Sequence, residues 1–103
     1  MDRNLIVIVD TTGTIQFWSG PAFGHSPQQA IGQTLDLIVP PQHREAHWRG
    51  FRRAMASGKA AAEGQVGDFP FLRADGESGP VPGRLTLLRQ AQDRVIGAMV
   101  VFG

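Results

Sequence analysis

Strand-type and helix-type segments are segregated along this chain, and that order limits the folds it can adopt. Residues 5–18 read as two short strands around a glycine-containing turn. Residues 26–58 carry helix signals, and residues 62–102 return to strand patterns. Segregated blocks favour an α+β domain with an antiparallel sheet, whereas alternating strands and helices would favour a parallel one. The sequence therefore predicts the order ββααα-βββ.

The middle block predicts three helical segments of unequal length. A short helix is expected over residues 26–32, because Ser26 suits an N-cap and Pro27 suits the first helical position. Residues 35–39 form an apolar linker long enough for one helical turn. The longest helix is expected from Pro40 to Gly58. Its apolar residues recur at three- and four-residue steps, at Trp48, Phe51 and Met55.

The last block predicts three strands, over residues 62–72, 81–89 and 95–102. The third is apolar on both faces, with residues 96, 98, 100 and 102 alternating against 95, 99 and 101. A strand that is apolar on both sides is normally covered on both sides. Helices in so short a chain can cover only one face. We therefore expect the outer sheet face to meet either a second copy of the chain, in a homodimer, or a neighbouring domain.

Length and composition exclude several classes of protein. At 103 residues, the chain is expected to be one domain, residues 1–103. The net charge of +1 is too small to indicate a nucleic-acid partner, and no apolar run approaches the roughly 18 residues of a membrane span. The absence of cysteine excludes disulfides and thiolate sites and fits a cytoplasmic protein. The acidic residues are scattered, so we expect no enzyme activity.

The histidines are the main candidates for chemistry. His47 lies between Trp48 and Phe51 on the expected long helix, and His43 precedes it by one turn. From the residues alone, His47 is either a partly buried structural histidine or a ligand. A pair of histidines at this spacing can bind zinc, but a third ligand is needed and none stands nearby. We expect His43 to be solvated and His25 to be a loop residue.

Four stretches resemble a PAS domain along nearly the whole chain: "IVIVDTTGTIQFW", "FGHSPQQAIGQTLDLIVP", "LRADGE" and "RVIGAMVVF". The resemblance implies the PAS fold, in which a five-stranded antiparallel sheet cups a ligand under short helices on one face. It also implies a role as a sensor or interaction module. The photoactive flavin and cinnamoyl subfamilies use a pocket cysteine, which this chain lacks.

The stretch "PPQHREAH" is similar to the haem-binding helix of the rhizobial oxygen-sensor histidine kinases. That resemblance implies haem b as cofactor, His47 as the proximal iron ligand and Arg53 as the partner of a haem propionate. The domain would then bind a diatomic gas (CO, NO or O2) opposite His47 or respond to the redox state of the haem. The distal arginine of the family falls on Gly67 in this chain. Its absence favours CO or NO over O2.

Other residues complete the expected haem site. Phe51 and Met55 share a helix face with His47, and Leu85 matches an apolar neighbour of the gas ligand. Met99 is left open as a second axial ligand. The alternative to a haem sensor is a cofactor-free PAS domain that acts as a dimerisation or small-ligand-binding signalling module.

Overall fold

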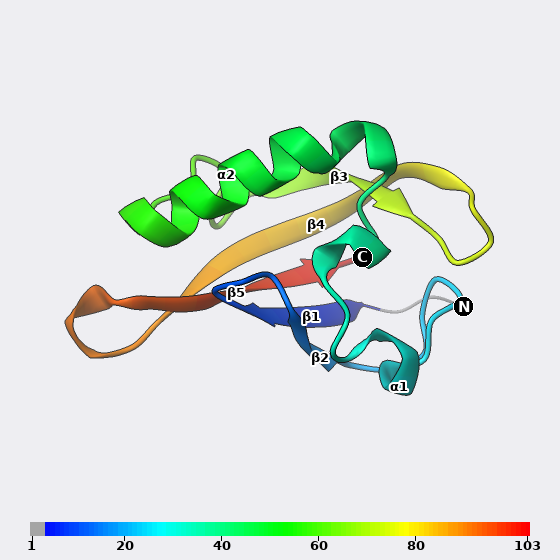
Figure 1. Ribbon diagram of the computed structural model, residues 1–103, viewed down its shortest axis with the longest axis horizontal. Helices are drawn as coiled ribbons and strands as arrows, with labels where there is room; N and C mark the ends of the chain where they lie inside the picture. The colour runs from blue at the N-terminus through cyan, green and yellow to red at the C-terminus, as the bar shows by residue number, and fades with distance from the viewer. Residues whose placement is uncertain (1–3) are drawn as a thin grey trace.

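The computed structural model describes residues 4–103, so the expected domain 1–103 begins three residues before the described part. Its centre is a five-stranded antiparallel sheet in the order β2-β1-β5-β4-β3 (Figure 1). The strands are β1 (Leu5–Asp10), β2 (Ile15–Trp18), β3 (Val66–Leu72), β4 (Ser78–Arg89) and β5 (Val95–Phe102). The C-terminal strand therefore lies in the middle of the sheet, between β1 and β4. The predicted α+β fold with an antiparallel sheet is confirmed.

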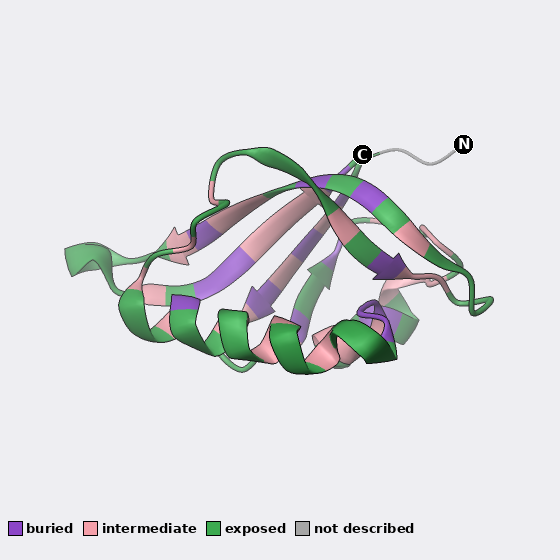
Figure 2. Cartoon of the chain, turned by 90° about the horizontal axis from the view of Figure 1, so that it is seen from above, coloured by how far each residue is buried: buried purple, intermediate pink, exposed green. Residues whose placement is uncertain are grey.

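The helical elements are short except for one. They are α1 (Pro27–Ala30), η1 (Leu35–Leu37), η2 (Pro41–His43), α2 (Arg44–Ser57) and η3 (Ala91–Asp93). Ser26 and Gln29 cap α1 reciprocally, and Gly58 ends α2 in the left-handed region at φ 73°. The long helix α2 lies across one face of the sheet (Figures 1 and 2). Within residues 4–103, no helix has both the length and the apolarity to cross a membrane.

Strand register decides which side chains face α2. Val100 of β5 pairs with Val7 on one side and Leu85 on the other, so these three residues share the inner face. Alternate residues along each strand follow them and form most of the core. Figure 2 shows the buried positions recurring along the strands that face α2. The fully buried large side chains are Trp18, Phe71, Leu5, Ile15 and Val7.

Two strand boundaries differ from the sequence prediction. β3 begins at Val66 instead of residue 62, because residues 61–65 form turns. β4 begins at Ser78 instead of residue 81, although Pro80 and Pro82 lie inside it. Proline is tolerated there because β4 pairs with β5 only from Gly83 onward, which leaves one edge of its first residues outside the β5 ladder.

A bulge corrects the predicted alternation of β5. The register shifts between Leu88 and Arg89, opposite the start of β5. Val95 consequently packs against the core, whereas Ile96 is 44% exposed. Met99 pairs with Ile8 and Thr86 on the outer face, because it alternates with the inward Val100. It therefore does not point toward the inner face, and a role as second axial ligand at His47 is wrong.

Candidate functional site: an apolar chamber beneath α2

A cavity of about 420 Å³ lies between α2 and the inner face of the sheet. This volume falls within the range of small-molecule and cofactor sites. Its lining is apolar except for His43 and His47. Helix α2 and the last residue of η2 contribute a stripe at three- and four-residue spacing, namely His43 from η2 and Ala46, His47, Gly50, Phe51, Ala54 and Met55 from α2. The sheet supplies the opposite wall, including Leu85, Leu87, Ala98 and Val100.

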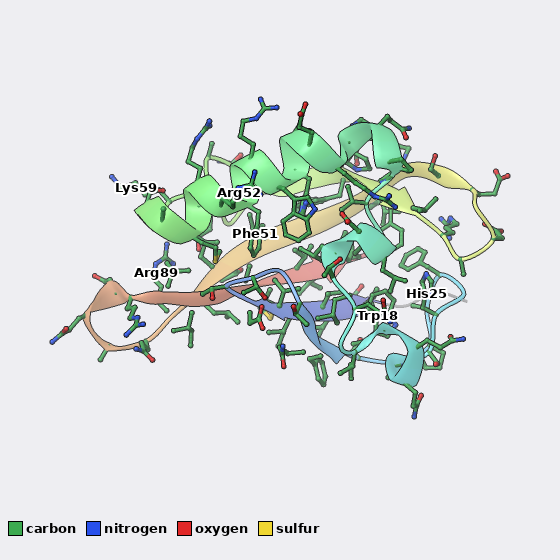
Figure 3. All side chains as sticks on the ribbon, in the orientation of Figure 1. Trp18, His25, Phe51, Arg52, Lys59 and Arg89 are labelled. Carbon is green, nitrogen blue, oxygen red and sulfur yellow. The ribbon has the colours of Figure 1, made fainter. Side chains whose placement is uncertain are left out.

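The ring of His47 is held by two aromatic neighbours. It lies edge-on to Trp48 with centroids 4.8 Å apart, and it stacks on Phe51 at 6.0 Å. Trp48 is itself positioned because its Nε1 donates a 2.8 Å hydrogen bond to Oδ1 of Asp36. Figure 3 shows Phe51 between α2 and the sheet. These contacts orient an imidazole on the wall of an apolar chamber.

One ring nitrogen of His47 lacks a hydrogen-bond partner within the described part of this apolar environment. Nδ1 is buried and has no hydrogen-bond partner among the described residues. Burial lowers the pKa of His47 below its ordinary value of 6.5, and the nearby Asp36 carboxylate only partly opposes that shift. The imidazole is therefore neutral near pH 7. A neutral imidazole with an unused ring nitrogen is the form in which histidine binds a metal.

Four of the six cofactor residues predicted from the sequence come together in this chamber. His47, Phe51, Met55 and Leu85 all line it. Gly67 is not among the lining residues, although it precedes Phe69 by two residues and therefore lies on the same face of β3. A Cβ at Gly67 would meet no atom within 4 Å. A side chain at this position would therefore extend into open space near the edge of the chamber.

Arg53 lies outside the chamber, on the exposed surface of α2. It follows Ala46 by seven residues and Gly50 by three, so it shares their flank of the helix. Ala46 and Gly50 are exposed and also line the chamber, which makes this flank one side of its mouth. Arg53 is consequently near the opening, where a charged group can remain hydrated.

Sequence reasoning missed the aromatic wall at the β3 edge. Phe69 and Phe71 both line the chamber, and each packs edge-on against Phe102, with centroids 5.6 Å and 5.1 Å apart. Phe71 also packs against Phe23, which adopts φ 54° in the turn before α1. The available signal was the alternation of Phe69 and Phe71. This alternation was given little weight because Gly64 and Gly67 indicated a weak strand over residues 62–72.

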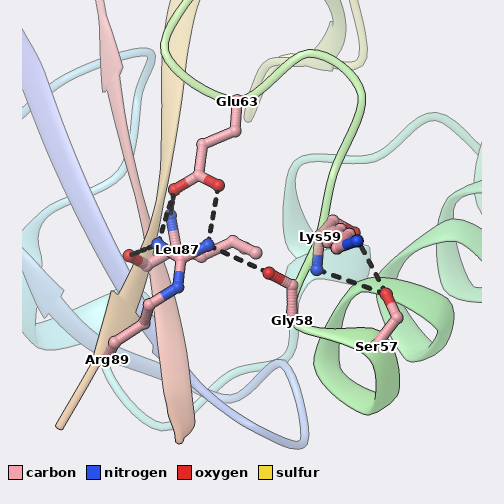
Figure 4. A network of polar contacts seen from close by, with 6 residues as sticks. All are labelled: Ser57, Gly58, Lys59, Glu63, Leu87 and Arg89. Carbon is pink, nitrogen blue, oxygen red and sulfur yellow. Dashed lines mark hydrogen bonds and ion pairs between the residues drawn. The ribbon is translucent and has the colours of Figure 1, made fainter. Parts of the chain in front are cut away.

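A polar clamp lies next to the C-terminal end of α2 (Figure 4). Arg89 makes two hydrogen bonds to the carboxylate of Glu63, at 2.9 Å and 3.0 Å, and donates another to the carbonyl oxygen of Gly58 at 3.0 Å. The Leu87 N–H donates to the same carboxylate at 2.8 Å. These contacts join the end of α2, the segment 58–65 and β4. Ala60, within that segment, lines the chamber.

The other histidines occupy different surroundings. His43 is exposed and lines the outer part of the chamber. His25 lies edge-on to Trp18 with centroids 5.9 Å apart, at the end of the sheet near α1 (Figure 3). Nε2 of His25 and Nε1 of Trp18 are both buried without a partner in the described part of the chain. Residues 4–103 contain no cluster of three or more side chains that would bind a metal by themselves.

Comparison with known proteins agrees with this architecture. Residues 2–102 match the family described as "PAS fold". The chain belongs to the PAS fold family. This PAS domain is also 25% identical over 81 residues to the oxygen sensor protein DosP of Escherichia coli (strain K12). That match covers 74% of the chain but only 10% of DosP, so the chain spans about a tenth of that relative.

Solved structures share the fold at lower identity. The PAS domain of a protein from Colwellia psychrerythraea superposes with a TM-score of 0.78 at 23% identity, covering 97% of this chain and 84% of that one. The RpfR quorum-sensing receptor PAS domain of Cronobacter turicensis, in complex with C12:0, gives 0.72 at 18% identity, with 99% and 93% covered. Together with the family match, these results identify the chain as a PAS domain by its fold.

Proposed function

We propose that this PAS domain binds haem b in the chamber beneath α2, with His47 as the iron ligand, and senses a diatomic gas. The observation that carries the proposal is His47 itself. It stands on the chamber wall, is neutral near pH 7 and has a buried ring nitrogen without a partner. Ligation through a ring nitrogen suits a haem iron, and haem supplies reversible gas binding and redox chemistry when bound. The similarity to an oxygen sensor protein supports this choice.

The remaining residues fit the parts of a haem. Phe51, Met55 and Leu85 provide apolar walls for the macrocycle. Arg53, on the exposed flank beside the mouth, is suited to pair a propionate by a charge-assisted hydrogen bond. Gly67, beside the chamber, offers no side-chain donor to a polar gas ligand. We therefore expect CO or NO to be preferred over O2, which depends more on such a donor.

The signal would leave through the outer sheet face. Ile6, Ile8, Met99 and Val101 lie on that face and are only partly buried in the described chain, and Phe17 is 44% exposed. A second copy of the chain, bound through this face, would cover the apolar surface. Because inner and outer residues alternate on the same strands, a change in the chamber can alter the spacing of this interface.

A second function is favoured by the lining of the chamber. Apart from the two histidines, no lining side chain is polar, so the chamber wall itself offers no cation for a propionate. This composition suits a cofactor-free domain that binds an apolar small molecule. The structural likeness to a PAS domain in complex with C12:0 is compatible with that alternative.

Absorption spectroscopy of the purified protein separates the two functions. If haem is bound through His47, the wild-type protein gives a haem spectrum and His47→Ala loses most of it while remaining folded. His43→Ala and His25→Ala serve as matched controls and should keep the spectrum. A colourless protein that also fails to bind added haem would reject the haem proposal. Retention in His47→Ala with loss in His43→Ala would reject His47 as the ligand.

A further inference from the structure

A second hollow adjoins the chamber and has a different chemical character. It encloses about 240 Å³ and is lined by residues of η2 and of the β3–β4 hairpin. Its polar side chains are Gln42, His43, Asp68 and Ser78, and the rest of its lining is Pro40, Pro70, Gly79 and Pro80. We call it the vestibule. It has donors and acceptors where the chamber is almost wholly apolar.

The two hollows meet at the edge of β3. His43 and Pro70 line both of them, so these residues form the boundary between chamber and vestibule. Register places Pro70 opposite Pro80 and Leu72 opposite Ser78, which puts Pro70, Ser78 and Pro80 on one face of the hairpin. The alternate residues Phe69 and Phe71 face the chamber. A molecule that occupies both hollows would cross the β3 edge beside His43 and Pro70.

The charge of the vestibule restricts what can enter it. Asp68 is the one carboxylate among its lining residues, and no lysine or arginine side chain contributes to it. Arg44, next in sequence to His43, donates to the carbonyl oxygens of Val39 and Asp36 at 3.0 Å each. Its guanidinium is thus already engaged. A ligand carboxylate would face Asp68 without a committed cation, whereas a hydroxyl or amide can hydrogen-bond to Asp68, Ser78 and Gln42.

We propose that the chamber and vestibule together form a site for an uncharged amphiphile, with its alkyl chain in the chamber and a hydroxyl or similar neutral polar group in the vestibule. This site deepens the cofactor-free function and does not require haem. It also separates two ends of the chamber mouth, because Arg53 lies toward the C-terminal half of α2 and the vestibule adjoins its N-terminal end. The neutral polar group of the ligand is placed at the second end, beside the vestibule.

The test compares two ligands of equal chain length, 1-decanol and decanoate, by isothermal titration calorimetry at pH 8. Haem-free wild-type protein and His47→Ala are titrated in parallel, so that a bound cofactor cannot mask the site. We expect 1-decanol to bind about tenfold more tightly than decanoate, because only the carboxylate is repelled by Asp68. Asp68→Asn should reduce that preference at least threefold, and Ser78→Ala should weaken 1-decanol binding.

Asp75→Asn is the matched control, because Asp75 lies in the exposed turn between β3 and β4 and does not line the vestibule. It should leave both affinities unchanged. Decanoate binding as tightly as 1-decanol, no binding of either, or a preference unaffected by Asp68→Asn would each overturn the proposal. None of these outcomes bears on the haem spectrum, which is measured on separate protein without alcohol. Failure of one proposal is therefore distinguishable from failure of the other.

Discussion

At Gly97, the central strand β5 passes so close to β1 that a side chain cannot be accommodated. A Cβ at this position would overlap the carbonyl oxygen of Val9, a backbone atom that cannot rotate away. Gly97 pairs with Asp10 on one side and Leu88 on the other, so it lies next to the bulge that reverses Val95 and Ile96. Glycine at this position thus permits the close approach of the strands that carry the inner wall.

The first prediction follows from this contact. Gly97→Ala should lower the free energy of unfolding by about 1–3 kcal/mol, the usual range for overpacking, because β1 and β5 must move apart. Chemical denaturation followed by tryptophan fluorescence measures the change. Gly79→Ala in β4 is the matched control, since a Cβ there meets no atom within 4 Å. Equal stability of the two variants would contradict this account of Gly97.

At the scale of elements, the chamber depends on how the segment 58–65 is attached. Within this segment, Glu63 binds Arg89 and the Leu87 N–H through its carboxylate, and the Gly64 N–H donates to the carbonyl oxygen of Leu85. Arg89 also reaches Gly58, the residue that ends α2. The clamp therefore joins the helix that carries His47 to the strand that forms the opposite wall.

The clamp predicts a dependence of stability on pH. The hydrogen bonds from Arg89, and then that from the Leu87 N–H, lower the pKa of Glu63 below its ordinary value of 4.5. A carboxyl group whose pKa is lower in the folded state stabilises the protein above its unfolded pKa, and that stability is lost as pH falls through the folded pKa. Wild-type protein should therefore be more stable than Glu63→Gln at neutral pH, and this difference in stability should shrink progressively below pH 4.5.

Thermal unfolding of both proteins between pH 7 and pH 3 measures this difference as a difference in unfolding temperature. The expected effect is small, because the clamp is partly exposed to solvent. Glu45→Gln is the control, since the side chain of Glu45 is 94% exposed and lies 3.7 Å from Arg49 in a single contact. If the difference in unfolding temperature between wild-type protein and Glu63→Gln stayed constant down to pH 3, that result would contradict the clamp.

At the scale of the whole molecule, the two faces of the sheet have different roles. The inner face is covered by α2 and encloses the chamber, whereas the outer face is apolar and only partly buried in the described chain. The proposed homodimer gives the outer face a partner and gives the chamber a route to an output. Residues that alternate on β5 divide between these roles, with Val100 inside and Val101 outside.

This division predicts opposite effects for neighbouring substitutions. Val101→Glu should leave the domain folded but shift it from dimer to monomer, because a charge is placed in the apolar interface. Val100→Glu is the comparison and should destabilise the fold, since it places a carboxylate on the apolar inner face, against the core. Light scattering and circular dichroism measure the two effects. Wild-type protein that remains monomeric at high micromolar concentration would exclude the interface.

The sequence alone predicted the strand and helix order, the capped start of α1 and the stop of α2 at Gly58. These features depend on residues within a few positions of one another, where capping, glycine and periodicity act directly. Helical spacing also placed His47, Phe51 and Met55 on one face. The resemblance to PAS domains then supplied the role proposed for that face, because spacing cannot say what a face binds.

Only the tertiary structure decided how that face is used. The clamp joins Glu63 to Arg89, 26 positions later, and the bulge at Leu88 and Arg89 exchanges the orientations of Val95 and Ile96. The vestibule likewise assembles residues from η2 and the β3–β4 hairpin. Such features depend on the register between strands and on the space left between packed elements. Both are set by contacts between residues far apart in the chain, which no local pattern records.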